Sequence, residues 1–116
     1  MTDVYIALPE PKVQEGASFT ATAYFRSGGA ASAPATNVKY RVDNLSTRKE
    51  LTDWTSVTPA VSVSITITSA HNKIQQNTND REIIQLTVAA DRGETSANYD
   101  SVIWQVENVY GYTKNA

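Results

Sequence analysis

Strict alternation of apolar and polar residues constrains this chain more than any other feature. The segment VSVSITIT, residues 61–68, has an aliphatic side chain at every odd position and Ser or Thr at every even position. A period of two is typical of a β-strand with one buried face, whereas a helix repeats every 3.6 residues. The segment therefore predicts a strand with Val63, Ile65 and Ile67 inward and Ser62, Ser64, Thr66 and Thr68 outward.

The same period recurs along the rest of the chain. We expect seven strands, within residues 4–8, 19–25, 38–42, 51–57, 61–68, 84–90 and 102–106. Helical periodicity is absent, and at most one helical turn is expected over 70–74. Runs rich in Gly, Pro, Asn, Asp and Ser separate the strands, as turns require. This pattern predicts a single all-β domain over residues 1–116, folded as an antiparallel sandwich.

The inward positions of these strands define a predicted core. Its members share period-two placement between polar neighbours, and they are Phe19, Val38, Tyr40, Val42, Val63, Ile65, Ile84, Leu86, Val88, Val102, Trp104 and Val106.

The outward face of VSVSITIT admits two interpretations. Ser and Thr suit an extended backbone and pair across strands, so the face can simply be solvated. A flat and uncharged face can also be a docking surface. A long strand without charge is hazardous at a sheet edge, where it recruits other chains. We therefore expect this strand inside its sheet, or covered by a partner.

The amino-acid composition argues against several classes of function. The chain has 116 residues, a net charge of −2 from 10 basic and 12 acidic residues, and no cysteine. Disulfides, thiolate nucleophiles and cysteine metal sites are thereby excluded. No basic stripe indicates nucleic acid. The longest uncharged run, residues 54–70, is about half Ser and Thr and does not read as a membrane span. The first residues lack the features of a signal peptide.

Candidate catalytic residues are few. His71 is the single histidine, and we expect it to be a loop residue. A catalytic triad through it is not excluded by the sequence, although no nucleophile elbow occurs. The carboxylates near turns, which include Glu82 and Asp91, are expected to cap those turns, and no pair of them stands out as a glycosidase pair. We predict no enzymatic activity and no catalytic, cofactor-binding or metal-binding residue.

Some of the aromatic residues also admit both a packing and a contact interpretation. Trp104 follows the inward period and is expected in the core. Trp54 is expected either to plug the end of the sandwich or to be an exposed contact, and Tyr110 either to staple the chain end or to meet a partner. The candidate partner contacts are Ser62, Ser64, Thr66, Thr68, Trp54 and Tyr110.

Four motifs carry a family resemblance. They are YRVDNL, DWTSVTPAVSVSIT, REIIQLTVAADRG and IWQVENVYG, which together span about residues 38–111. In this pattern the chain resembles short proteins encoded among the virion genes of tailed bacteriophages, and the DWTS block is its most specific part. Such proteins are small immunoglobulin-like or fibronectin-like sandwiches. The resemblance thus implies an immunoglobulin-like antiparallel sandwich of about seven strands, and it supplies no catalytic residues.

The resemblance also implies a setting. We expect a virion structural protein, a capsid decoration or another head or tail component, made in the host cytoplasm and acting by surface adhesion. Its partners would be other virion proteins, a homo-oligomer included, with neither nucleic acid nor membrane. The first alternative is a carbohydrate- or cell-surface-binding adhesin module, which needs an exposed Trp or Tyr platform. The second is an enzyme accessory domain or a small hydrolase.

Overall fold

Two β-sheets pack face to face in the computed structural model of the chain, which describes residues 2–76, 78–95 and 97–108. The strands are β1 (Asp3–Ala7), β2 (Lys12–Gln14), β3 (Phe19–Ser27), β4 (Ala30–Ala31), β5 (Val38–Asn44), β6 (Lys49–Val57), β7 (Ser62–Ile67), β8 (Arg81–Ala90) and β9 (Asn98–Glu107). No helix forms over the described residues. The predicted all-β sandwich is therefore confirmed.

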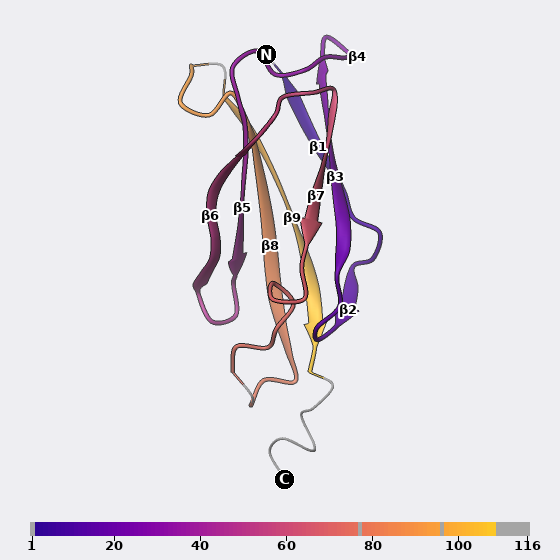
Figure 1. Cartoon of the computed structure of the whole chain (residues 1–116), viewed down its shortest axis with the longest axis vertical. Coiled ribbons are helices and arrows are strands. Elements are labelled where there is room, and N and C mark those ends of the chain that lie inside the picture. Colours follow the sequence, from indigo (N-terminus) through magenta and orange to yellow (C-terminus); the bar gives the residue numbers. More distant parts are fainter. Residues whose placement is uncertain (1, 77, 96, 109–116) are drawn as a thin grey trace.

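One sheet has four strands and the other has five. In the four-stranded sheet β3 pairs with β1, β4 and β7, and in the five-stranded sheet the order is β2-β9-β8-β5-β6. The chain crosses from β6 in one layer to β7 in the other near the end of the sandwich that holds the N-terminus (Figure 1). All pairings are antiparallel except that of β2 with β9, which is parallel.

Two short strands were not predicted. Residues 12–14 lie between prolines and a glycine and show no alternation, yet they pair with β9 as β2 after the Pro9–Pro11 break moves the chain to the other sheet. The Gly- and Ala-rich segment after β3, where the sequence predicts a turn-rich run, is a tight hairpin to β4. Gly28 and Gly29 at its tip have φ values of 62° and 85°, the positive values that two-residue hairpin turns of type I′ require.

The predicted core is largely confirmed. Phe19, Tyr40 and Val102 are half-buried and pack against the core, whereas the other predicted members are buried. Trp104 is 1% exposed and meets the Phe19 ring edge-on, at 5.2 Å between centroids. The turn after β7 adds Ile74, which is buried although no periodic pattern marks it.

Candidate interaction surface

The outward side of the four-stranded sheet is a continuous polar face. Register places Thr66 of β7 opposite Thr20 of β3, Ser64 opposite Thr22, and Ser62 opposite Tyr24. Directly opposed residues of antiparallel strands project from the same side of the sheet. We call this surface the Ser/Thr/Tyr face, and its members are Tyr5, Ala7, Thr20, Thr22, Tyr24, Ser62, Ser64 and Thr66.

No member of the Ser/Thr/Tyr face is charged. The members from β7 are exposed, and their neighbours Val63, Ile65 and Ile67 are buried. The predicted orientation of this strand is thus confirmed. The charged residues Asp3 and Arg26 lie opposite each other at one end of the β1–β3 pair, beyond the members of the face.

Two tyrosines give this face its apolar part. Tyr5 is 63% exposed and Tyr24 is 43% exposed, and their rings stack with centroids 6.3 Å apart. Neither was among the predicted contacts. The signal was present in the sequence, because Tyr5 lies between the inward Val4 and Ile6, and Tyr24 continues the outward row of β3.

The predicted place of β7 inside its sheet is wrong. Over the described residues β7 is paired with β3 alone, so it is an edge strand. The physical reason lies in the connections. The chain enters β7 from the other layer, and after residues 68–80 it returns to that layer as β8, so neither connection supplies a second neighbour.

Thr68 does not belong to the strand or to the face. β7 ends at Ile67, and the Thr68 N–H donates to His71 Nδ1 at 3.0 Å. The other ring nitrogen of His71, Nε2, lies 2.7 Å from Thr52 Oγ1. His71 therefore closes the turn after β7, as expected of a loop residue, and burial lowers its pKa below the ordinary value.

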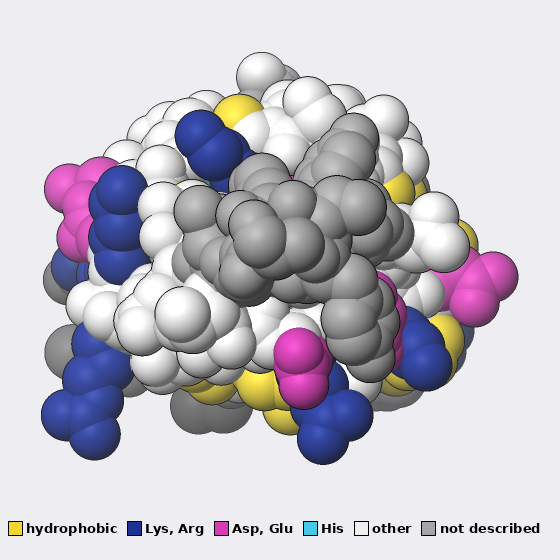
Figure 2. All heavy atoms as spheres, turned by 90° about the horizontal axis from the view of Figure 1, so that it is seen from below, with side chains coloured by type: hydrophobic (Ala, Val, Ile, Leu, Met, Phe, Trp, Pro, Cys, Tyr) yellow, Lys and Arg dark blue, Asp and Glu magenta, His cyan; other side chains and the backbone are white. Residues whose placement is uncertain are grey.

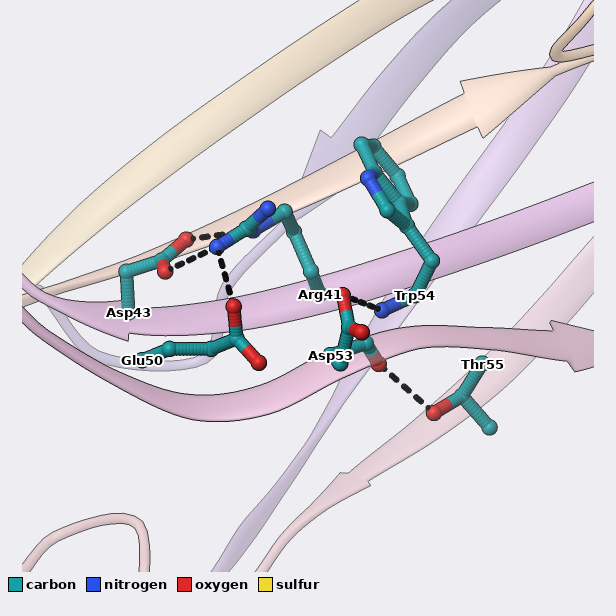
Figure 3. A network of polar contacts seen from close by, with 6 residues as sticks. All are labelled: Arg41, Asp43, Glu50, Asp53, Trp54 and Thr55. Carbon is teal, nitrogen blue, oxygen red and sulfur yellow. Dashed lines mark hydrogen bonds and ion pairs between the residues drawn. The ribbon is translucent and has the colours of Figure 1, made fainter.

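Trp54 is not a plug at the end of the sandwich. It lies half-buried on the outer side of the five-stranded sheet, beside Arg41 of β5 (Figure 3). The guanidinium carbon of Arg92 is 4.4 Å from the Trp54 ring centroid and that of Arg41 is 5.7 Å away. Tyr99 meets the ring edge-on at 6.3 Å. The structure therefore does not bring Trp54 together with the Ser/Thr/Tyr face.

Arg41 is itself held by carboxylates. Its Nε and Nη2 donate to Asp43 at 2.9 and 2.7 Å, and Nη2 also donates to Glu50 at 3.1 Å (Figure 3). A guanidinium that is fixed in this way stays beside the indole, which favours the cation–π contact. Trp54 is accordingly a packed member of the sheet surface.

Three of the four sequence motifs meet at this cluster. Arg41 and Asp43 come from the YRVD motif, Trp54 from DWTS and Arg92 from ADRG. Asp91, also in ADRG, accepts hydrogen bonds from the backbone N–H groups of Thr36 and Asn37 at 2.7 and 3.3 Å. The motifs therefore specify how β5, β6 and the β8–β9 connection are joined, and Asp91 has its predicted capping role.

Glu82 is the fully buried carboxylate of the described chain. It accepts hydrogen bonds from the backbone of Gln75 and Gln76 and from the side chains of Asn44 and Asn79, all at 2.8–3.0 Å. Burial raises the pKa of Glu82, but the four donors outweigh it and hold the pKa below the ordinary value. The predicted turn-capping role of Glu82 is confirmed.

The described part of the chain contains no pocket and no group of three His, Cys, Asp or Glu side chains placed to hold a metal ion. Residues with both signs of charge stand around the rim at the end where β9 finishes (Figure 2). Among the described residues there is no helix with the length and apolarity that a membrane crossing needs. Tyr110 lies outside the described residues.

Comparison with known proteins adds nothing to this picture, since no family model, no curated protein and no solved structure matches the chain.

Proposed function

We propose that the chain is a non-enzymatic structural protein of a tailed-bacteriophage virion, a capsid decoration or another head or tail component, that adheres through the Ser/Thr/Tyr face. The observation that carries this proposal is the face itself. It is uncharged and mostly exposed, and it includes two stacked tyrosines. Tyrosine is enriched in protein interfaces, where charged residues are depleted at the centre.

The finer fold that we propose is immunoglobulin-like. The pairing of β3 with β7 in one sheet and the order β9-β8-β5-β6 in the other correspond to strands B and E opposite G, F, C and C′ of that fold. The first part of the chain contributes β1 to one sheet and β2 to the other. This connectivity supports the fold that the motif resemblance implies.

The virion setting rests on the sequence motifs. The four motifs resemble those of tailed-phage virion proteins, and three of them contribute residues to the cluster around Trp54. These motifs therefore support membership in a structural class, and the motif that begins with DWTS also supplies Ser62, Ser64 and Thr66 to the face on the opposite sheet.

The area of the Ser/Thr/Tyr face limits how strongly a single copy can bind through it. Three strands spaced about 4.8 Å apart and six residues long give a patch of about 15 by 20 Å. A stable interface buries about 800 Å² on each partner. A contact confined to this patch would therefore be weak by itself. Many copies on one particle would act together, because multivalent attachment raises avidity without new contacts.

The test measures how much of the protein binds to purified phage particles when all variants are present at equal concentration. We call this quantity the occupancy. Thr20→Lys on β3 and Ser64→Lys on β7 both place a charge on the face, and Ser101→Lys is the matched control on the outer side of β9. We expect both face variants to lower occupancy, because an unpaired charge in an interface is costly to desolvate, and the control to behave as wild type. Equal occupancy of all four proteins would refute the face as the contact, and absence of the protein from particles would refute the virion role.

The adhesin alternative is favoured by one observation, the exposed Tyr5–Tyr24 pair. Aromatic platforms of this kind stack on sugars, whereas Trp54 already has Arg92 beside its ring. Glycan-array binding that is lost in both Tyr5→Ala and Tyr24→Ala but kept in Trp54→Ala would favour this alternative over the virion role.

A further inference from the structure

We infer that β7 pairs with β7 of a second copy of this chain and joins two four-stranded sheets across a two-fold axis. This pairing goes beyond the proposed function and does not depend on it. It concerns the backbone edge of β7, whereas adhesion to particles concerns the side-chain face.

The hydrogen-bond pattern shows which groups of β7 are open. The Phe25 N–H donates to the Val61 carbonyl, one step beyond the opposed pair Tyr24 and Ser62. In antiparallel sheets, residues that exchange hydrogen bonds alternate with residues that do not. The backbone N–H and C=O groups of the odd residues of β7 therefore point toward β3. Those of Ser62, Ser64 and Thr66 point away from it.

The open edge has a defined length. None of these three residues has a hydrogen-bond partner among the described residues. The next even residue, Thr68, donates its N–H to His71 Nδ1 and is closed to a partner. Three consecutive donor–acceptor pairs thus remain, between Val61 and the His71 turn.

The edges formed by β1 and β6 are protected. On β1 the Ile6 N–H donates to the Asp100 carboxylate at 3.2 Å. On β6 the edge carries Lys49, Glu50 and Asp53, and its pairing with β5 is irregular. Bulges and charges of this kind are devices that prevent strand addition. β7 has none of them, since the strand contains no charge, no proline and no bulge.

Charge complementarity selects a second copy as the occupant. Among the described strands longer than two residues, β7 is the single one without Asp, Glu, Lys or Arg. A charged strand added here would leave its charges without counterparts on β7. A second β7 places Ser and Thr opposite Ser and Thr, a favourable cross-strand pairing.

One register uses all the open groups. An antiparallel pair centred on Ser64 places Ser64 opposite Ser64 of the second copy and Ser62 opposite Thr66, twice by symmetry. A shift of one pair toward Thr68 is blocked by the His71 hydrogen bond. The centred register also places the buried faces of both β7 strands on the same side, so the two cores become neighbours across the axis.

Sedimentation equilibrium of purified protein over a concentration series tests the pairing. We expect wild type to convert reversibly to twice the mass of one chain. Ser64→Lys and Ser64→Glu each place like charges opposite each other at the axis, and each should weaken association by on the order of tenfold or more. An equimolar mixture of the two should regain the dimer, while Ser101→Lys should associate as wild type does. A single-chain mass for wild type at every concentration would overturn the inference.

The register has its own test. The double variant S62K/T66E places Lys opposite Glu at both off-centre pairs and should dimerise, whereas S62K/T66K places Lys opposite Lys and should stay monomeric. Circular dichroism melting of each variant verifies that it is folded, so that loss of the dimer is not loss of the fold. Equal dimerisation of these two variants, or a dimer unaffected by either charge at Ser64, would show that the copies meet elsewhere and would overturn the inference. Thr20→Lys, off the edge, should keep the dimer whatever its effect on particle occupancy.

Discussion

Trp104 Nε1 donates a hydrogen bond of 2.7 Å to Asn72 Oδ1, and both side chains are buried. The same Asn72 donates through Nδ2 to the Ala17 carbonyl at 2.8 Å, and its own carbonyl accepts from the Gly16 N–H at 2.9 Å. One amide therefore joins the turn after β7 to β9 and to the segment before β3.

Asn72→Ala should destabilise the fold markedly. The substitution leaves the indole N–H and the Ala17 carbonyl without their partners, and each unsatisfied buried group costs about 1–3 kcal/mol. We expect a loss of about 2–4 kcal/mol in the free energy of unfolding, measured by urea denaturation. Lys73→Ala, at the exposed neighbouring position, is the matched control and should stay within about 0.5 kcal/mol of wild type. A loss of that small size for Asn72→Ala would contradict the buried network.

Glu82 should make the protein sensitive to acid. Its pKa in the folded state lies below the unfolded value of about 4.3. A lowered folded pKa contributes stability above the unfolded pKa, and this contribution is lost as pH falls through the folded pKa. The free energy of unfolding should therefore decrease below about pH 4.5.

Glu82→Gln separates this effect from that of other carboxylates. The variant should be less stable at neutral pH, because its amide NH₂ replaces one carboxylate oxygen and faces two of the four donors. It should also show a shallower loss of stability in acid. If the free energy of unfolding of the variant falls in acid as steeply as that of wild type, the acid sensitivity comes from a different group. Glu94→Gln, at an exposed turn position, serves as the control.

The sequence predicted the strands because the buried face of each strand repeats with period two. Ile65 and Trp104 show why this works, since both lie in the middle of alternating segments and both are buried. The same logic failed for residues 12–14 and for Ile74, whose places depend on hydrogen bonds to distant segments and on the turn around Asn72. Local patterns carry no information about such contacts.

The candidate surface was predictable only in part. Alternation placed Ser62, Ser64 and Thr66 outward, but it says nothing about which strands are neighbours, so the edge position of β7 was missed. The place of Trp54 was left open between a plug and an exposed contact because its strand lacks clean alternation, and the plug alternative is wrong. Only the fold brings Arg92, from a loop 38 residues later in the sequence, beside its ring.

Trp54 and Arg92 should be energetically coupled. A double-mutant cycle with Trp54→Ala and Arg92→Ala should give a coupling of about 0.5–1 kcal/mol in the free energy of unfolding, as partly exposed cation–π pairs do. Because the guanidinium of Arg41 lies farther from the ring, the cycle with Arg41→Ala should give a smaller value. The idea fails if the coupling to Arg92 is zero. Trp54→Ala should leave the β7 dimer unchanged, since the residue lies on the opposite sheet.

His71 should give the fold a second, milder dependence on pH. Its Nδ1 accepts the Thr68 N–H, which requires a neutral ring, and burial lowers its pKa. A folded pKa below the unfolded value of about 6.5 contributes stability above pH 6.5, and this contribution is lost as pH falls through the folded pKa.

The histidine effect can be isolated by substitution. The sequence, which shows His71 only as a loop residue, predicts that His71→Ala changes little. The structure instead predicts a loss of about 1 kcal/mol at neutral pH, because the hydrogen bonds to Thr68 and Thr52 disappear. The variant should also show a flatter stability profile from about pH 6.5 down to the onset of the Glu82 effect. Urea denaturation of wild type and variant at a series of pH values measures both. If the two profiles run parallel through this range, the ring does not titrate with folding and the role given to its neutral form is wrong.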